Sequence, residues 1–249
     1  MDNNIIPKKK TRLKTFLAIS LVFNILLLAS VYYIGVIKTN FYERTKVWLG
    51  IDERTQELRD DFYCLFGWSN TLEQLNYDAD VVFYGNSITT GGYFQQYFPN
   101  VKVCNLGYPG DDLDGLVFRV NQIKYLNPEK IFVMGGINRL KEMSDEDFEQ
   151  KYRCMVGSIK SAVPNAKIYL QSILPINYRM TGAYANSQKI ISSNEIIKAI
   201  SKQTGCTYVD LYSIFEENGE MPAELTYDGV HLNRKAYDIW TEEIRQYVE

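Results

Sequence analysis

The sequence predicts an α/β domain, a parallel β-sheet with helices on both faces, behind an N-terminal membrane anchor. From residue 80 onward, short apolar runs alternate with longer helical stretches. Ahead of them, residues 15–37 contain no charged side chain. The composition, 46% hydrophobic and 23% charged, is that of a globular protein and excludes a largely disordered chain.

The N-terminal apolar segment comes first along the chain. As a helix, its 23 residues (15–37) would span roughly 34 Å, enough for a hydrocarbon core of about 30 Å. It is longer than the apolar part of a cleavable signal peptide, so we expect an uncleaved signal anchor, with cleavage as the alternative. Five basic residues within residues 1–14 predict a cytoplasmic tail and a single-pass protein whose remaining chain lies outside the cytoplasm.

Residues 38–78, rich in charged and aromatic side chains, are expected to form a membrane-proximal helical linker. The domain itself is expected over residues 79–249. Residues 38–249 hold 22 basic and 29 acidic side chains, a net charge of about −7. An acidic domain gives no electrostatic reason to expect a nucleic-acid partner.

Five short runs rich in Val, Ile, Tyr and Phe, each bounded by Gly, Pro, Asn or Asp, predict buried parallel strands. They are residues 80–84, 101–105, 130–134, 167–171 and 207–210. Helices are expected at residues 112–126, 144–163, 186–204 and 233–247. Ser144 and Asp147 approximate a capping box at the start of the second helix. Ligands of such sheets bind beyond the carboxyl ends of the strands, so functional residues are expected in the loops there.

The four cysteines, Cys64, Cys104, Cys154 and Cys206, are widely spaced and form no zinc-binding pattern. The chain has one histidine, His231, which excludes a histidine-rich metal site, and we expect no metal ion. Disulfides are allowed in an oxidising compartment. Buried free thiols are the alternative, and the sequence leaves this question open.

Polar or glycine-rich segments follow the first three expected strands. Ser87 begins a helix after the first strand, and a helix amino end favours a developing negative charge. Alone, such a serine is more often a helix cap. Gly110 lies in a turn whose backbone N–H groups can face a ligand, although an ordinary turn is the simpler interpretation. Asn138, after the third strand, can donate to an oxyanion or cap the next segment.

Asp228 and His231 lie three residues apart in a glycine-containing turn just before the last helix. The carboxylate can hold the imidazole Nδ1–H and leave Nε2 free as a base. A lone surface or core histidine is the alternative, but the neighbouring Asp favours the pair. With Ser87, Gly110 and Asn138, these residues supply a nucleophile, a base, an orienting group and oxyanion donors, the equipment for acyl transfer.

Four segments together resemble the sequence blocks of the SGNH (GDSL-type) hydrolases, in the same order and with matching spacing, over roughly residues 79–249. They are Gly85-Asn86-Ser87-Ile88, Asn105-Leu106-Gly107-Tyr108-Pro109-Gly110, Gly135-Gly136-Ile137-Asn138 and Asp228-Gly229-Val230-His231-Leu232. The resemblance implies a flavodoxin-like three-layer α/β fold and ester hydrolysis without a metal or organic cofactor. It also implies Ser87 as nucleophile, His231 as base and Asp228 as orienting residue. The implied oxyanion hole consists of the Ser87 N–H, the Gly110 N–H and the Asn138 side chain.

Two positions depart from the family pattern. Asn86 stands where the first block usually has Asp, which should keep a local hydrogen bond but remove a charge. Arg139 follows Asn138 where the third block commonly has Asp. The Arg139 cation could recognise an anionic substrate or replace a structural cap, and the second interpretation is slightly favoured.

These features predict a membrane-anchored extracytoplasmic serine esterase that removes short acyl or acetyl groups from carbohydrate or related small esters. The expected partners are that small ester or acylated glycan and, through the N-terminal helix, the membrane. The oligomeric state is left open. The alternatives are a lysophospholipase acting on lipid esters, an acyltransferase that passes the acyl group to a sugar hydroxyl, and a non-catalytic binding domain on the same fold.

Overall fold

The computed structural model describes residues 7–32, 78–181 and 186–249 of the 249-residue chain. The chain divides into two units, Met1–Leu65 and Phe66–Glu249. The boundary between them falls within the predicted linker over residues 38–78, which lies outside the described residues except for residue 78.

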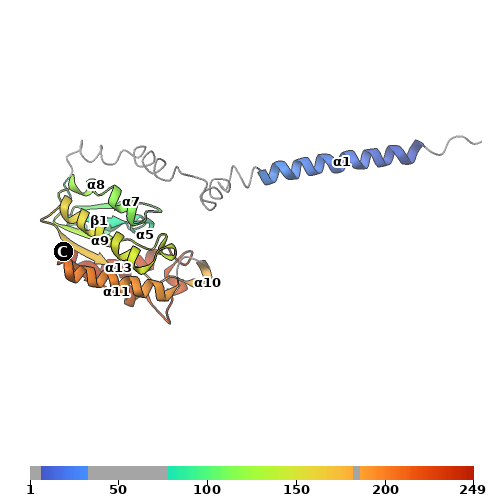
Figure 1. Ribbon diagram of the computed structural model, residues 1–249. Coiled ribbons are helices and arrows are strands. Elements are labelled where there is room, and N and C mark those ends of the chain that lie inside the picture. The colour runs from blue at the N-terminus through green and yellow to red at the C-terminus, as the bar shows by residue number, and fades with distance from the viewer. Residues whose placement is uncertain (1–6, 33–77, 182–185) are drawn as a thin grey trace, which may run out of the picture. The chain divides into compact units, whose positions relative to one another are not determined.

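Helix α1 (Pro7–Tyr32) belongs to the first unit and has 26 residues (Figure 1). Large apolar side chains along it are exposed, by 69% for Phe16 and 68% for Leu28. In the part of the chain that the structure describes, no helix combines the length and the apolar character needed to cross a membrane. Residues 33–37 of the predicted anchor lie outside the described residues, and the anchor stays a prediction.

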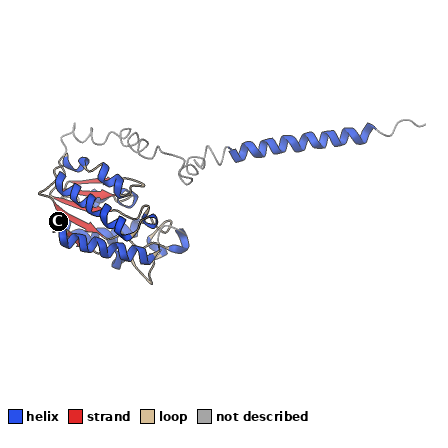
Figure 2. Cartoon of the chain, viewed as in Figure 1, coloured by secondary structure: helices blue, strands red, loops and turns tan. Residues whose placement is uncertain are grey.

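The second unit contains a sheet of five parallel strands, as predicted (Figure 2). The strands are β1 (Val81–Gly85), β2 (Val103–Gly107), β3 (Lys130–Met134), β4 (Lys167–Gln171) and β5 (Thr207–Val209). Their order in the sheet is β2-β1-β3-β4-β5, so the chain adds β2 on one side of β1 and then crosses to the other side for β3. The switch point lies between β1 and β3, where ligands bind in open α/β sheets.

Three long helices of this unit begin and end close to the predicted positions. They are α9 (Asp145–Ala162), α11 (Ser187–Thr204) and α13 (Arg234–Val248). The Ser144 hydroxyl accepts the Asp147 N–H at 3.0 Å, which confirms Ser144 as the N-cap of α9. Shorter helices are α5 (Ser87–Thr90), α6 (Phe94–Tyr97), α10 (Tyr178–Thr181), α12 (Tyr212–Phe215), η2 (Leu140–Glu142) and η3 (Ala223–Leu225).

Side chains of β1 alternate between two helical layers, which confirms helices on both faces of the sheet. Phe83 stacks on Phe94 of α6 with 3.6 Å between ring centroids, and Phe94 meets Trp240 of α13 edge-on. Tyr84, the next residue, donates its hydroxyl to the Leu116 carbonyl on the other face. Leu116 belongs to α7 (Leu113–Phe118), and α9 packs against both α7 and α11 on that face.

Two boundaries differ from the prediction. The single helix expected over residues 112–126 is two short helices, α7 and α8 (Asn121–Lys124).

Strands β1 and β2 run through Gly85 and Gly107, which pair in register, although the prediction places both glycines in loops. A Cβ atom at Gly85 would lie 2.2 Å from Thr89 Oγ1 and 2.3 Å from the Met134 carbonyl oxygen. The glycine therefore allows close packing at the strand end rather than a turn.

Candidate active site

The side chains of Ser87, His231 and Asp228 lie together. Ser87 is the first residue of α5, two residues past the end of β1, and its Oγ lies 2.9 Å from Nε2 of His231. Nδ1 of the same ring lies 2.6 Å from Asp228 Oδ2. Both distances are those of hydrogen bonds. The three side chains therefore form one chain of contacts, although Ser87 and His231 are 144 residues apart.

A short turn holds Asp228 against His231. Asp228 Oδ1 accepts the backbone N–H of His231 at 2.8 Å and that of Val230 at 3.0 Å. Thr226 closes the turn, since its hydroxyl donates to the His231 carbonyl and accepts the Gly229 N–H. The geometry of the Asp–His pair is therefore built within a single segment of the chain.

This turn also keeps Asp228 ionised. Partial burial disfavours the carboxylate, but hydrogen bonds from the His231 ring and from the N–H groups of His231 and Val230 outweigh it and lower the pKa of Asp228 to about 2. An ionised carboxylate accepts the Nδ1–H, which assigns the neutral ring the tautomer with Nε2 unprotonated. Nε2 can then accept the hydrogen bond of the Ser87 hydroxyl.

Gly110 and Asn138 lie beside the same strand ends. The loop carrying Gly110 is joined to β1 by a hydrogen bond of 2.9 Å from the Tyr108 N–H to the Gly85 carbonyl. Asn138 Nδ2 donates to the Asp111 carbonyl at 2.6 Å, which joins this loop to the segment after β3. An amide has two N–H groups, so the Asn138 side chain can keep this bond and still donate to a ligand.

The two departures from the family pattern have structural roles. Asn86 is 1% exposed, and its Oδ1 accepts the Ile88 N–H at 3.0 Å as the N-cap of α5, so the expected local hydrogen bond is present. Arg139 has a φ of 60° just before η2, and its guanidinium lies 2.8 Å from Glu142 and 3.6 Å from Asp112. These ion pairs favour the structural interpretation of Arg139.

A cleft of about 370 Å³ opens beside Ser87 and His231. Tyrosine dominates its wall, which also includes a cation and an amide: Tyr93, Tyr97, Tyr227, Tyr237, Arg234 and Gln96. Tyr93 and Tyr227 are 72% and 71% exposed. A second cavity, of about 10 Å³, is lined by Asn86 and Ile88, which flank Ser87 in sequence, and by apolar residues after β3 and β4.

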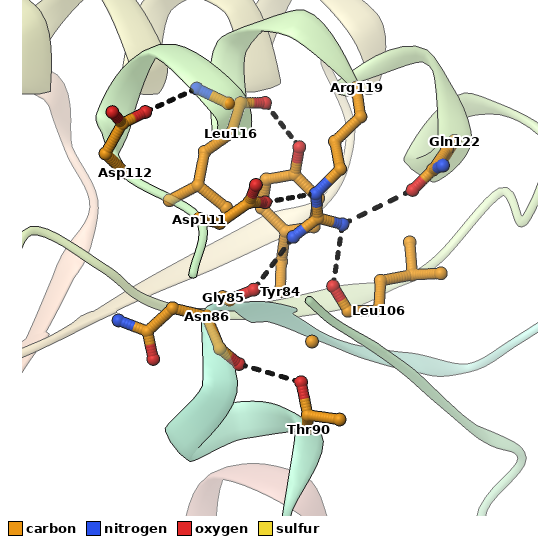
Figure 3. Close-up of polar contacts among 12 residues, drawn as sticks. Tyr84, Gly85, Asn86, Thr90, Leu106, Asp111, Asp112, Leu116, Arg119 and Gln122 are labelled. Atoms are coloured by element: carbon orange, nitrogen blue, oxygen red, sulfur yellow. Dashed lines mark hydrogen bonds and ion pairs between the residues drawn. The ribbon is translucent and has the colours of Figure 1, made fainter. Parts of the chain in front are cut away.

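One charged pair of this region was not found by sequence reasoning. Arg119 and Asp111 are each 4% exposed, and 2.5 Å separates Arg119 Nε from Asp111 Oδ2 (Figure 3). The sequence places Arg119 inside a predicted helix and indicates no partner for it. The available signal was a single arginine among the apolar residues Val117, Phe118 and Val120, on a helix expected to pack against a sheet.

The described cysteines, Cys104, Cys154 and Cys206, are free thiols, and Cys64 lies outside the described residues. Disulfides among these three are therefore absent. Burial raises the pKa of the Cys104 thiol to about 11. Within residues 7–32, 78–181 and 186–249, no three His, Cys, Asp or Glu side chains are grouped so that they could hold a metal ion.

Comparisons with known proteins agree with this architecture. A sequence profile of the GDSL-like Lipase/Acylhydrolase family matches residues 83–239. A protein from Streptococcus pneumonia has a similar structure, with a TM-score of 0.66 and 19% identity, covering 80% of this chain and 100% of that one. A GDSL-like lipase from Bacteroides thetaiotaomicron gives a TM-score of 0.60 at 25% identity, with coverages of 68% and 86%.

A third similar structure is that of a catalytic mutant of Axe2, an acetylxylan esterase from Geobacillus stearothermophilus. It has a TM-score of 0.56 and 20% identity, and the match covers 69% of this chain and 94% of that one. No match was found among curated proteins. The family profile spans more than half of the chain and includes both Ser87 and His231. The chain therefore belongs to the GDSL-like lipase/acylhydrolase family and is a serine ester hydrolase.

Proposed function

We propose that Ser87, His231 and Asp228 are the catalytic triad of this esterase. The observation that supports it is the unbroken hydrogen-bonded chain, 2.9 Å from Ser87 Oγ to His231 Nε2 and 2.6 Å from His231 Nδ1 to Asp228. His231 Nε2 takes the proton of the Ser87 hydroxyl while Oγ attacks the ester carbonyl carbon. The N–H groups of Ser87 and Gly110 and the amide of Asn138 then donate to the oxyanion of the tetrahedral intermediate.

The same residues complete the reaction. When the intermediate collapses, the C–O bond to the alcohol breaks, and the alcohol leaves with the proton from His231 Nε2. An acyl ester on Ser87 remains. Water gives a proton to His231 and attacks this ester, and the second collapse releases the carboxylic acid and returns the proton to Ser87. Asp228 stays ionised throughout and holds the ring through Nδ1.

Short acyl groups on carbohydrate are the proposed substrate. The cleft of about 370 Å³ falls in the usual size range of small-molecule sites, and the exposed rings of Tyr93 and Tyr227 offer flat amphipathic faces to a sugar. The cavity beside Asn86 and Ile88 holds about 10 Å³, close to one water-sized group, which is compatible with the methyl of an acetyl group. One similar structure is that of an acetylxylan esterase.

Replacement of the nucleophile tests the triad. Ser87→Ala should reduce turnover of p-nitrophenyl acetate to background, and a fluorophosphonate probe should label the wild type but not this variant. Ser161→Ala is the matched control, since Ser161 is exposed and its hydroxyl donates to the Gly157 carbonyl of its own helix. Wild-type turnover in Ser87→Ala would contradict the triad. Failure of the probe to label the folded wild type would favour the non-catalytic alternative.

The substrate is tested separately. Acetylated xylooligosaccharides, lysophospholipids and p-nitrophenyl esters of increasing chain length should be compared with the wild-type enzyme. We expect the largest kcat/KM for acetyl esters and free acetate as the product. Faster cleavage of long acyl chains would favour the lipid alternative, and acetyl groups transferred to an added sugar would favour the acyltransferase.

The proposal also includes the membrane anchor and a domain outside the cytoplasm. It rests on the uncharged residues 15–37, the five basic residues before them and the exposed apolar side chains of α1. The full chain should stay with membranes after an alkaline carbonate wash, whereas a chain that starts at residue 38 should be soluble. Release of the full chain by the wash would contradict an anchor.

The orientation is tested separately. Protease added outside intact cells should digest the domain, and full protection of the domain would contradict the proposed orientation.

A further inference from the structure

Arg119 occupies the centre of a buried polar cluster (Figure 3). Its side chain is 3% exposed and lies at the end of α7, with the guanidinium carbon 4.4 Å from the centre of the Tyr84 ring. Nη2 donates to the Gly85 carbonyl at 2.8 Å, and Nε pairs with Asp111. Nη1 donates to the Leu106 carbonyl at 2.7 Å and to Gln122 Oε1 at 3.3 Å. A buried cation needs this complete set of partners, because an unpaired charge in the interior is very costly.

The partners of Arg119 lie where the proposed oxyanion donors begin. Gly85 and Leu106 belong to the carboxyl ends of the neighbouring strands β1 and β2. Two residues after Gly85 the chain reaches Ser87, and Asp111 directly follows Gly110. One rigid planar group therefore connects both strand ends to the loop that carries Gly110.

Asp111 links this cluster to Asn138. Its carboxylate faces Arg119 at 2.5 Å, and its backbone carbonyl accepts the Asn138 amide at 2.6 Å. The next residue, Asp112, caps α7 by accepting the Gly115 N–H at 2.9 Å. The backbone around Gly110 is thus held by two side chains. Arg119 connects it to the ends of β1 and β2, and Asn138 connects it to the segment after β3.

We propose that Arg119 is a positioning residue for the oxyanion hole. It holds Asp111, and through Asp111 it fixes the Gly110 N–H and the Asn138 amide relative to Ser87. The inference rests on the proposed function, in which these groups donate to the oxyanion. Arg119 itself does not touch the substrate. Its effect is therefore on the rate of the chemical steps rather than on substrate binding.

Arg119→Lys is the first test. The charge is kept, but a single ammonium group cannot bond Gly85, Leu106 and Asp111 in the fork geometry of a guanidinium. Turnover of p-nitrophenyl acetate should fall by about 10–100-fold in kcat, as expected for a small displacement of catalytic groups, while KM changes by less than about 2-fold. Val248→Ala is the control for lost stability. The Val248 side chain is buried, and its backbone carbonyl accepts a hydrogen bond from the Lys130 side chain at the amino end of β3, the end opposite the site.

Coupling to Asn138 distinguishes positioning from a general structural role. Asn138→Ala alone should lower kcat by about 10²–10³-fold. If Arg119 acts partly through Asn138, the loss in the double variant should be clearly smaller than the product of the two single losses, because independent sites would multiply their losses. Losses that multiply, or an Arg119→Lys loss no larger than that of Val248→Ala, would overturn the inference. If Arg119→Lys does not fold, Asp111→Asn, which keeps the backbone carbonyl, is judged by the same two criteria.

The outcome is separable from that of the proposed function. Full activity of Ser87→Ala would reject the triad whatever Arg119 does. Background activity of Ser87→Ala together with multiplying losses at Arg119 and Asn138 would keep the triad and reject the positioning role alone.

Discussion

Alanine substitutions at Gly110 and Gly205 form a matched pair of tests. Comparing them distinguishes the effect of backbone strain from a loss of catalysis. Gly110 has a φ of +82° and Gly205 a φ of +71°, and a Cβ atom at either position would meet nothing within 4 Å. Gly110 precedes the buried Asp111 in the proposed oxyanion loop, whereas Gly205 ends α11 ahead of the amino end of β5. Alanine at either site therefore adds strain without a clash.

The two substitutions should cost the same stability. A non-glycine residue in the left-handed region costs roughly 1–2 kcal/mol, so both variants should lower the free energy of unfolding by that amount. Only Gly110→Ala should affect catalysis, because relief of the strain turns the Gly110 N–H away from the oxyanion. Losing one such donor reduces kcat by about 10²–10³-fold, which is the upper limit of the expected effect.

The assay combines urea unfolding with p-nitrophenyl acetate kinetics on the wild type and the two variants. Gly205→Ala should keep the wild-type kcat despite its lost stability. If Gly110→Ala is destabilised to the same extent but its kcat stays within about 2-fold of the wild type, Gly110 is not an oxyanion donor. A large kcat loss in Gly205→Ala would instead show that stability alone controls the measured rate.

Further predictions concern the Asp–His pair and the core. Asp228→Asn should lower kcat by up to about 10⁴-fold, measured with p-nitrophenyl acetate, because the ring of His231 loses the carboxylate that selects its tautomer. The pKa of Asp228 in the folded protein, about 2, lies below its ordinary value of 3.8. Its ionised form therefore stabilises the fold above about pH 4, and this contribution is lost as the pH falls towards 2. Urea midpoints between pH 2 and 5 should show this acid dependence in the wild type and a smaller one in Asp228→Asn. Trp240→Phe should cost about 1–3 kcal/mol in urea unfolding, because the indole N–H donates to buried Gln171 at 2.7 Å. Adding Gln171→Leu should recover much of that loss, and an additive second loss would contradict this account.

The strands and the contact between Asp228 and His231 could be predicted because each depends on residues close together in the sequence. Apolar runs fill most of β1, β3 and β4, and residues 130–134 and 167–171 match β3 and β4 at both ends. Asp228 and His231 are three residues apart, so their contact could be inferred from spacing alone. The parallel order of the strands then brings Ser87 to the same edge of the sheet.

What could not be predicted depends on distant backbone groups. Arg119 bonds carbonyls that lie 13 and 34 residues earlier in the chain, and carbonyl positions leave no mark on side-chain patterns. The helix expected over residues 112–126 is interrupted at Arg119 and Val120. Arg119, at the end of α7, turns its charged side chain into the interior, and the spacing of apolar residues does not predict a buried charge.

The turn from Thr226 to Leu232 holds His231, the proposed base, and the Asp228 carboxylate as one unit, but the distance from that unit to Ser87 depends on how α13 docks. The Tyr237 hydroxyl on α13 donates to the Ile88 carbonyl of α5 at 2.6 Å, a direct tie between the two halves of the site. Trp240 of the same helix packs on Phe94 and donates to Gln171 of β4. The distance between His231 and Ser87 therefore depends on the core packing of α13 as well as on the residues of the site itself.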